Sequence, residues 1–146
     1  MKVAGCELCE QGGGSIVLAN EWLRVVLVDD ADFPGFTRVI WDDHVREMTD
    51  LDARLRSRLM ETVLAVERAQ REVLEPAKIN LASLGNLTPH LHWHVIPRFA
   101  DDSHFPQPVW GARQRQVPES AMAKRRARLD PLRRRIAEEV SSVAWI

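Results

Sequence analysis

His90, His92 and His94 recur at a spacing of two within residues 89–98, and the chain contains only five histidines. In a β-strand, this spacing directs all three side chains to one face and places the apolar residues between them on the other. A neutral imidazole is a nucleophile, a proton acceptor and a metal ligand near neutral pH, because its ordinary pKa is about 6.5. A strand face made of imidazoles therefore predicts a site with a chemical role.

A second group of reactive side chains begins with Cys6 and Cys9, the only cysteines in the sequence. A Cys-x-x-Cys pair can supply two thiolates to zinc, and a structural zinc site contains four ligands. The same spacing also suits a redox pair or a disulfide. The N-terminus lacks the apolar core of a signal peptide, so we expect a cytoplasmic protein with reduced thiols. Metal binding is therefore the favoured interpretation.

The run His90–Ile96, with the sequence His-Leu-His-Trp-His-Val-Ile, resembles the signature of the histidine triad (HIT) superfamily of nucleotide hydrolases and transferases. It fits the signature at every position. The turn at Gly85-Asn86 before the run, and Pro97-Arg98 after it, also resemble many bacterial members. The resemblance implies an enzyme that cleaves a nucleoside phosphoramidate or a dinucleoside polyphosphate through a nucleotidyl-histidine intermediate, without an organic cofactor.

The resemblance also implies a role for each histidine of the triad. His92 corresponds to the nucleophile of the family, and His94 corresponds to the histidine that contacts the phosphate. His90 corresponds to the first histidine, which orients its neighbours or, in metal-binding members, ligates zinc. In zinc-binding bacterial relatives two cysteines and another histidine complete the metal site. The corresponding set for a structural zinc in this chain is Cys6, Cys9, His44 and His90.

Five polar residues fall near positions where relatives contact the substrate: Asn80, Asn86, Thr88, Asp29 and Asp30. Asn86 aligns with a turn position where relatives carry Gln near the phosphate. Leu87 stands where many relatives have Ser or Thr, and Thr88 is the nearest hydroxyl. The two aspartates fall near the carboxylate that holds the ribose in relatives. A role in satisfying the backbone explains Asn80 equally well, and a turn-forming role explains the aspartates equally well.

Two other functions would use the same residues. The three histidines can be read as ligands of a catalytic zinc whose bound water attacks the substrate, although the motif lacks a carboxylate to act as base. The chain can also be read as a nucleotide-binding or sensing module with little turnover. Mutation of His92 separates these functions, because a sensor would still bind nucleotide and a metal hydrolase would lose active-site metal.

Alternating and apolar runs predict the strands that must position these side chains. A Gly-containing turn returns the fourth strand into the histidine strand, and this arrangement predicts an antiparallel hairpin. Three glycines after the cysteine pair predict a flexible turn that separates the pair from the first strand. Before the histidine strand, the predicted strands cover residues 15–19, 22–28, 36–41 and 78–84.

Apolar residues at helical spacing from Leu51 to Val73 predict one long amphipathic helix, capped by Thr49 together with Asp52. Two C-terminal helices follow over residues 119–129 and 131–140. Strands, one helix and more strand predict an α+β fold built on an antiparallel sheet, similar to the HIT fold. We expect a HIT domain over residues 1–111 and a helical extension over residues 112–146 that packs on the same domain.

The length of 146 residues suits one hydrophobic core, and no apolar run is long enough to cross a membrane. Residues 1–110 carry 11 basic and 17 acidic side chains, whereas residues 111–146 carry 9 and 4. A basic tail suggests nucleic acid as a partner, but arginines on predicted helices without interleaved aromatic residues favour solvated faces that pair with the acidic body. We therefore expect a nucleotide substrate, no specific nucleic acid and, from the resemblance, a homodimer.

Overall fold

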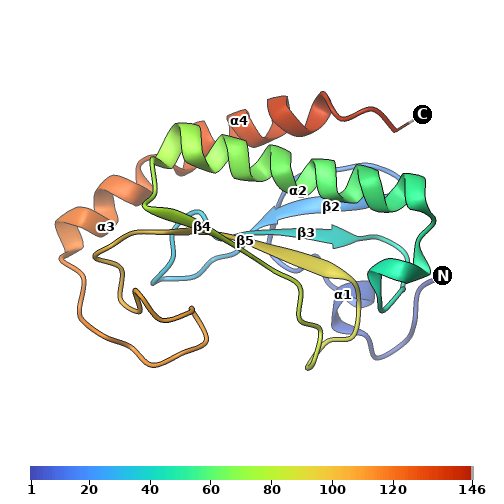
Figure 1. Ribbon diagram of the computed structural model, residues 1–146, viewed down its shortest axis with the longest axis horizontal. Coiled ribbons are helices and arrows are strands. Elements are labelled where there is room, and N and C mark those ends of the chain that lie inside the picture. The colour runs from blue at the N-terminus through green and yellow to red at the C-terminus, as the bar shows by residue number, and fades with distance from the viewer. Residues whose placement is uncertain (146) are drawn as a thin grey trace.

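The computed structural model describes residues 1–145 and confirms the α+β fold with an antiparallel sheet (Figure 1). The helices and strands are, in chain order, α1 (Glu7–Glu10), β1 (Ser15–Ala19), β2 (Leu23–Leu27), β3 (Thr37–Trp41), the 3-10 helix η1 (Met48–Asp50), α2 (Ala53–Leu74), β4 (Lys78–Ala82), β5 (His92–Arg98), α3 (Glu119–Arg126) and α4 (Leu129–Ser141).

The five strands form one sheet in the order β1-β2-β3-β5-β4, and every neighbouring pair is antiparallel. The strand that carries His92 and His94 lies between β3 and β4, so it has hydrogen-bonded neighbours on both sides. In the register of the sheet, His94 lies opposite Arg38 of β3 and Ala82 of β4, and His92 lies opposite Ile40. The two catalytic candidates are thus held by the interior of the sheet.

The two faces of the sheet are covered differently. On one face, Val25, Val39 and Val95 are fully buried in the main core, where they pack with α2 and α4. Figure 1 shows these two helices side by side over the sheet. On the opposite face, Ile40 packs in a small cluster with Leu8 of α1. This second face is covered by a short helix and by loops, which leaves space for a pocket.

The long amphipathic helix is present, but its N-cap is Asp52 and not Thr49. The Asp52 carboxylate accepts a hydrogen bond from the backbone N–H of Leu55 at 2.9 Å. Thr49 lies within η1, where Glu47 and Asp50 form the capping box. Several residues suited to capping follow one another here, and the 3-10 turn decides which of them begins the helix.

The C-terminal segment packs on the same core as the sheet. α4 lies along α2 and buries Leu132, Ile136 and Val140. Basic residues of the segment form ion pairs with acidic residues nearer the N-terminus: Arg113 with Asp32, Arg125 with Asp101, and Arg135 with Glu72. Over residues 1–145, none of the helices combines the length and the apolarity that a membrane crossing requires.

Candidate functional site

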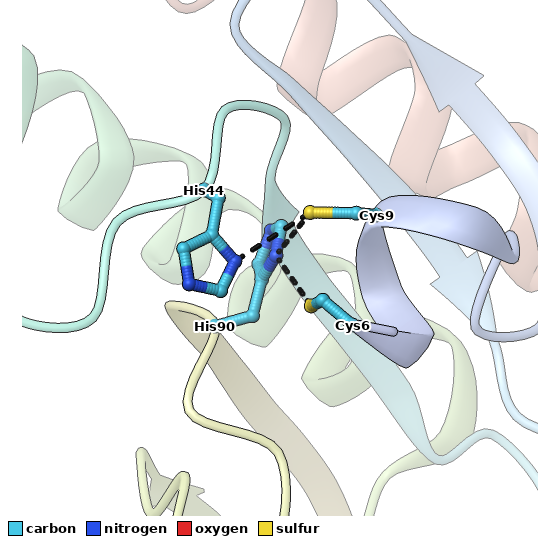
Figure 2. A group of neighbouring side chains, drawn as sticks. All are labelled: Cys6, Cys9, His44 and His90. Atoms are coloured by element: carbon cyan, nitrogen blue, oxygen red, sulfur yellow. Dashed lines mark hydrogen bonds between the residues drawn. The ribbon is translucent and has the colours of Figure 1, made fainter. Parts of the chain in front are cut away.

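Figure 2 shows Cys6, Cys9, His44 and His90 with their side chains turned toward one another. The cysteines belong to α1 and its N-cap, whereas the histidines lie in the loops after β3 and before β5. The Sγ atoms of Cys6 and Cys9 each lie 3.4 Å from Nδ1 of His90, and one ligand atom from each of the four residues lies within 4.8 Å of the others. Ligand atoms of tetrahedral zinc are roughly 3.3 to 3.8 Å apart, so the geometry fits zinc after small movements.

The ring of His90 is held in the tautomer that a zinc ligand needs. Its Nε2 lies 2.6 Å from the backbone oxygen of Trp41. Because a carbonyl oxygen only accepts hydrogen bonds, Nε2 carries the proton and Nδ1 keeps its lone pair for the metal. Burial lowers the pKa of His90, which also favours the neutral ring.

Leu91, Trp93 and Val95 pack in the main core, and the three histidines lie on the other side of the sheet, toward α1. Only His92 and His94 line the pocket, whereas His90 belongs to the cluster with the cysteines. β5 begins at His92, and the ring of His90 faces the thiols. A turn precedes the strand and is closed by a hydrogen bond of 2.8 Å from the N–H of His90 to the carbonyl of Thr88. The three histidines therefore contribute to two neighbouring sites, the cluster that contains His90 and the pocket that contains His92 and His94.

His92 has one ring nitrogen bonded and one available. Its Nδ1 lies 2.5 Å from the backbone oxygen of His90, so Nδ1 donates and the lone pair lies on Nε2. Burial lowers the pKa of His92, and the positive charge of Arg38 lowers it further. The side chain of His92 lines a pocket of about 410 Å³, a size suited to a small ligand. A neutral imidazole with a free nitrogen in a pocket is a nucleophile.

His94 lies beside His92, with 4.9 Å between ring centroids and an interplanar angle of 82°. Burial, with smaller contributions from His92 and Arg38, lowers the pKa of His94 to about 4. Its Nδ1 is buried and has no hydrogen-bond partner within residues 1–145. The ring lies between Phe36 and Trp110, whose centroids are 5.5 and 5.2 Å away. A buried polar atom without a partner in a pocket is a place for a ligand atom.

Of the predicted substrate contacts, Asn86 and Thr88 line the same pocket as the two histidines. The hydroxyl of Thr88 lies 3.4 Å from the Glu7 carboxylate, across the entrance from α1. Leu87, at the tip of this turn, is 95% exposed. The turn before the histidine strand therefore forms one wall of the pocket.

The other predicted contacts lie elsewhere. The Asn80 side-chain oxygen accepts a hydrogen bond from Arg98 at 2.9 Å, so this amide has a structural partner. Asp29 is exposed, and the half-buried Asp30 carboxylate accepts a hydrogen bond from the N–H of Asp32 at 2.9 Å. Asn80 and Asp30 therefore have local structural roles, and the structure brings neither aspartate into the wall of the pocket.

Arg38 and Trp110 also line the pocket, and neither was predicted from the sequence as a site residue. Arg38 is the only charged residue in the otherwise apolar or neutral strand β3, and this isolated charge was the available signal. Trp110 is 54% exposed and follows a loop that is tied to the end of β5. The tie is a buried ion pair in which Arg98 donates to Asp102 at 2.8 and 3.0 Å, and Arg98 also donates to the carbonyl of Gln107.

Comparison with known proteins agrees with this geometry. The family model described as the HIT domain matches residues 11–101. The chain is 30% identical to the histidine triad protein blr8122 from Bradyrhizobium japonicum, with a TM-score of 0.70 over 86% of this chain and 92% of that one. It is 28% identical to a histidine triad protein from Marinobacter aquaeolei VT8, with a TM-score of 0.70 over 93% and 99% of the two chains.

A zinc-bound histidine triad family protein from Mycobacterium smegmatis shares the fold at 22% identity, with a TM-score of 0.59 over 88% of this chain and 95% of that one. No curated protein sequence matches the chain. The family model spans all five strands and the long helix α2, and the 30% identical structure covers 86% of the chain. This protein therefore belongs to the HIT family.

Proposed function

We propose that this protein is a nucleotide hydrolase or transferase in which His92 is the covalent nucleophile. The observation that carries the proposal is the hydrogen bond from Nδ1 of His92 to the carbonyl of His90, which leaves Nε2 free in the pocket. The substrate class, a nucleoside phosphoramidate or a dinucleoside polyphosphate, comes from the resemblance of residues 90–96 to the HIT signature.

In the proposed reaction, Nε2 of His92 attacks phosphorus while the bond from phosphorus to the leaving group breaks. The positive charge that develops on the ring is stabilised by the hydrogen bond from Nδ1 to the carbonyl of His90. Water then cleaves the bond between Nε2 and phosphorus, which releases the nucleoside monophosphate and restores the neutral ring. His94, whose ring lies next to that of His92, contacts the phosphate in this mechanism.

The geometry favours covalent catalysis over a zinc hydrolase that uses the triad as metal ligands. Within residues 1–145, the cluster suited to a metal contains His90 with the two cysteines and His44. His92 and His94 lie in a separate pocket without a third histidine. A binding or sensing module with little turnover has the same geometry, and kinetics separate it from an enzyme.

Trapping of the intermediate tests the covalent step. Labelled adenosine phosphoramidate, diadenosine triphosphate and diadenosine tetraphosphate are each mixed with the protein and quenched at high pH, where phosphohistidine-type bonds last longest. We expect a nucleotidyl adduct on the peptide that contains His92. An adduct on another peptide, or turnover without any adduct, argues against the mechanism, and ligand binding without turnover identifies a sensor.

Substitution of the two histidines separates their roles. His92→Asn removes the nucleophile but keeps a polar side chain, so turnover should fall by several orders of magnitude while nucleotide binding survives. His94→Asn should reduce turnover by about 10² to 10³-fold, because it removes only part of the phosphate contact. Steady-state kinetics and calorimetric titration measure both effects. Near-wild-type turnover of His92→Asn would contradict the proposal.

We also propose a structural zinc on Cys6, Cys9, His44 and His90. The converging ligand atoms and the fixed tautomer of His90 support it, and the related protein from Mycobacterium smegmatis is described as zinc-bound. Zinc held by these side chains would cross-link α1 to the loop after β3 and to the loop before β5. The proposed compartment is the cytoplasm, where thiol ligands remain reduced.

Elemental analysis of protein purified without a metal-affinity tag tests the zinc site. We expect about one zinc per chain, and we expect its loss when Cys6→Ala and Cys9→Ala are combined. His104→Ala is the matched control, because His104 lies outside the cluster and should leave the zinc content unchanged. Absence of zinc from the wild type, or zinc retained by the double cysteine variant, would rule the site out.

A further inference from the structure

Two arginines, the buried Arg24 of β2 and the half-buried Arg38 of β3, lie on the same face of the sheet as His92 and His94. Their surroundings differ. Arg24 donates to the backbone carbonyls of Gly12, Leu8 and Gln11 at 2.6 to 2.9 Å, and its Nη1 lies 3.5 Å from Asp42. The guanidinium of Arg24 is therefore enclosed by acceptors, as a structural arginine should be.

Arg38 has far fewer partners. Its Nη1 donates to the carbonyl of Gly13 at 3.0 Å, and its Nε is buried without any hydrogen-bond partner within residues 1–145. No carboxylate of residues 1–145 lies within ion-pair distance of Arg38. The carboxylates of Glu7 and Asp30 act on it only from farther away, and burial lowers its pKa.

An isolated cation in a partly buried position is unfavourable unless an anion completes the site. The Phe36 ring lies 5.9 Å from the guanidinium carbon of Arg38, and Glu7 lines the same pocket without forming an ion pair with Arg38. The guanidinium of Arg38 therefore still has N–H groups available for an anion. It lies opposite His94 in the register of β3 and β5, and it lines the pocket with His92. A guanidinium also matches the oxygens of a phosphate group better than any other side chain does.

We propose that Arg38 is a catalytic residue outside the triad, which binds the non-bridging oxygens of the phosphate that His92 attacks. This inference rests on the proposed function and deepens it. It assigns stabilisation of the phosphate charge to a residue of β3, a strand outside the histidine motif. Arg38 and His94 then contact the phosphate from adjacent strands, while the turn that contains Asn86 and Thr88 closes the pocket from the other side.

Calorimetric titration with AMP and with adenosine tests the proposal, because the two ligands differ only in the phosphate. Arg38→Gln should weaken AMP binding by about 10- to 100-fold and leave adenosine binding within about twofold. Arg38→Lys should lose less AMP affinity, because it keeps the charge but not the planar fork. kcat/KM for the best nucleotide substrate should fall by at least about 10²-fold in Arg38→Gln.

Thermal unfolding without ligand supplies an independent readout. Arg38→Gln removes a poorly paired buried charge, so the midpoint should stay constant or rise. The upward shift that AMP causes in the wild type should shrink in this variant. Arg24→Lys is the matched control: it disrupts the bonds to three carbonyls and should lower the midpoint, while AMP affinity stays within about twofold.

Equal losses of AMP and adenosine affinity in Arg38→Gln, or unchanged AMP affinity, would overturn the role of Arg38 while the adduct on His92 still tests the proposed function. A lower unfolding midpoint together with equal losses would assign Arg38 a structural role, like that of Arg24. A wild type that binds neither AMP nor GMP and turns over no nucleotide would contradict the proposed function itself, and the role of Arg38 with it.

Discussion

His94 is a neutral side chain enclosed by aromatic rings and by another imidazole, and its protonation opposes folding. Its pKa is about 4 in the folded protein and about 6.5 in an unfolded chain, so the unfolded state binds more protons between these values. The resulting stability is fully present above pH 6.5 and is lost as the pH falls toward 4. The contribution is at most about 3 kcal/mol, which is the difference between the two pKa values converted at about 1.4 kcal/mol per unit.

Urea unfolding between pH 7 and pH 4.5 measures this effect. The wild type should lose stability more steeply than His94→Asn, which cannot titrate, and the two curves should approach each other at the acidic end. Acid would also release the proposed zinc, but both proteins contain the same four candidate ligands, so the difference between the two curves isolates His94. Parallel curves across the range would show that His94 does not titrate with a lowered pKa.

At the level of single residues, the site residues that could be predicted from the sequence were those that occur in a regular spacing. The spacing of two paired His92 with His94, and Cys-x-x-Cys led to the metal cluster. Arg38 was not predicted, because an arginine in a strand usually reaches solvent, and its poor pairing depends on α1 folding back over the sheet. The partner of Asn80 is Arg98 of the neighbouring strand, whose side chain is held by Asp102 and Gln107 of the loop after β5. That loop has no periodic signal.

Among the elements, the loop between β5 and Gly111 is organised by a single buried ion pair. The Arg98 and Asp102 side chains are 3% and 1% exposed, and Asp102 also accepts hydrogen bonds from the backbone N–H groups of Phe99, His104 and Phe105. This arrangement determines where the loop runs. Trp110, which the loop brings against His94, therefore depends on an ion pair that lies outside the pocket.

Removal of Arg98 tests this dependence. Arg98→Met should lower the free energy of unfolding by about 3 to 5 kcal/mol, because it leaves the Asp102 carboxylate buried and unpaired. The double variant Arg98→Met with Asp102→Leu should recover part of that loss, since neither charge remains. Denaturant unfolding of the wild type, Arg98→Met, Asp102→Leu and the double variant gives the coupling energy. A coupling near zero would show that the loop is held by its other contacts.

The glycine run after the cysteine pair shows where element prediction fell short. We expected a flexible turn, but Gly13 has a φ of 81° and its backbone packs tightly: a Cβ there would lie 2.7 Å from Ile40. The carbonyls of Gly12 and Gly13 accept hydrogen bonds from Arg24 and Arg38. The sequence showed the permissive backbone, whereas the arginines that fix it come from strands 12 to 25 residues farther along the chain.

On the scale of the whole molecule, β4 is an edge strand with apolar side chains beside it. Leu81 and Leu84 are 37% and 55% exposed, and Leu64 of α2 is 39% exposed. An uncovered edge of this kind is a surface for pairing with a second strand. If the chain forms the homodimer that the HIT resemblance implies, we expect β4 to lie in its interface.

Light scattering during size-exclusion chromatography tests this arrangement. The wild type should have twice the mass of one chain, and the variant with Leu81→Lys and Leu84→Lys should have the mass of a single chain. Ile16→Lys is the matched control, because Ile16 is 53% exposed on the opposite edge strand and should leave the dimer intact. A monomeric wild type, or a dimer disrupted only by Ile16→Lys, would contradict the assignment.

We expect the basic C-terminal segment to bind nucleic acid only weakly, with an affinity that falls steeply as the salt concentration rises. Arg113, Arg125 and Arg135 already pair with acidic residues, so fewer charges are free for phosphates. Sub-micromolar, sequence-dependent binding at physiological ionic strength would contradict this expectation.

Trp110 has a consequence for how the protein can be observed. Among the five tryptophans it is the one with an exposed ring, and that ring borders the pocket. Because indole emission responds to the polarity of its surroundings, a ligand that enters the pocket should shift the fluorescence spectrum of the unmodified protein. A Trp110→Phe variant provides the blank. The chain thus carries an intrinsic optical probe, with which rapid mixing can follow ligand arrival and product departure separately.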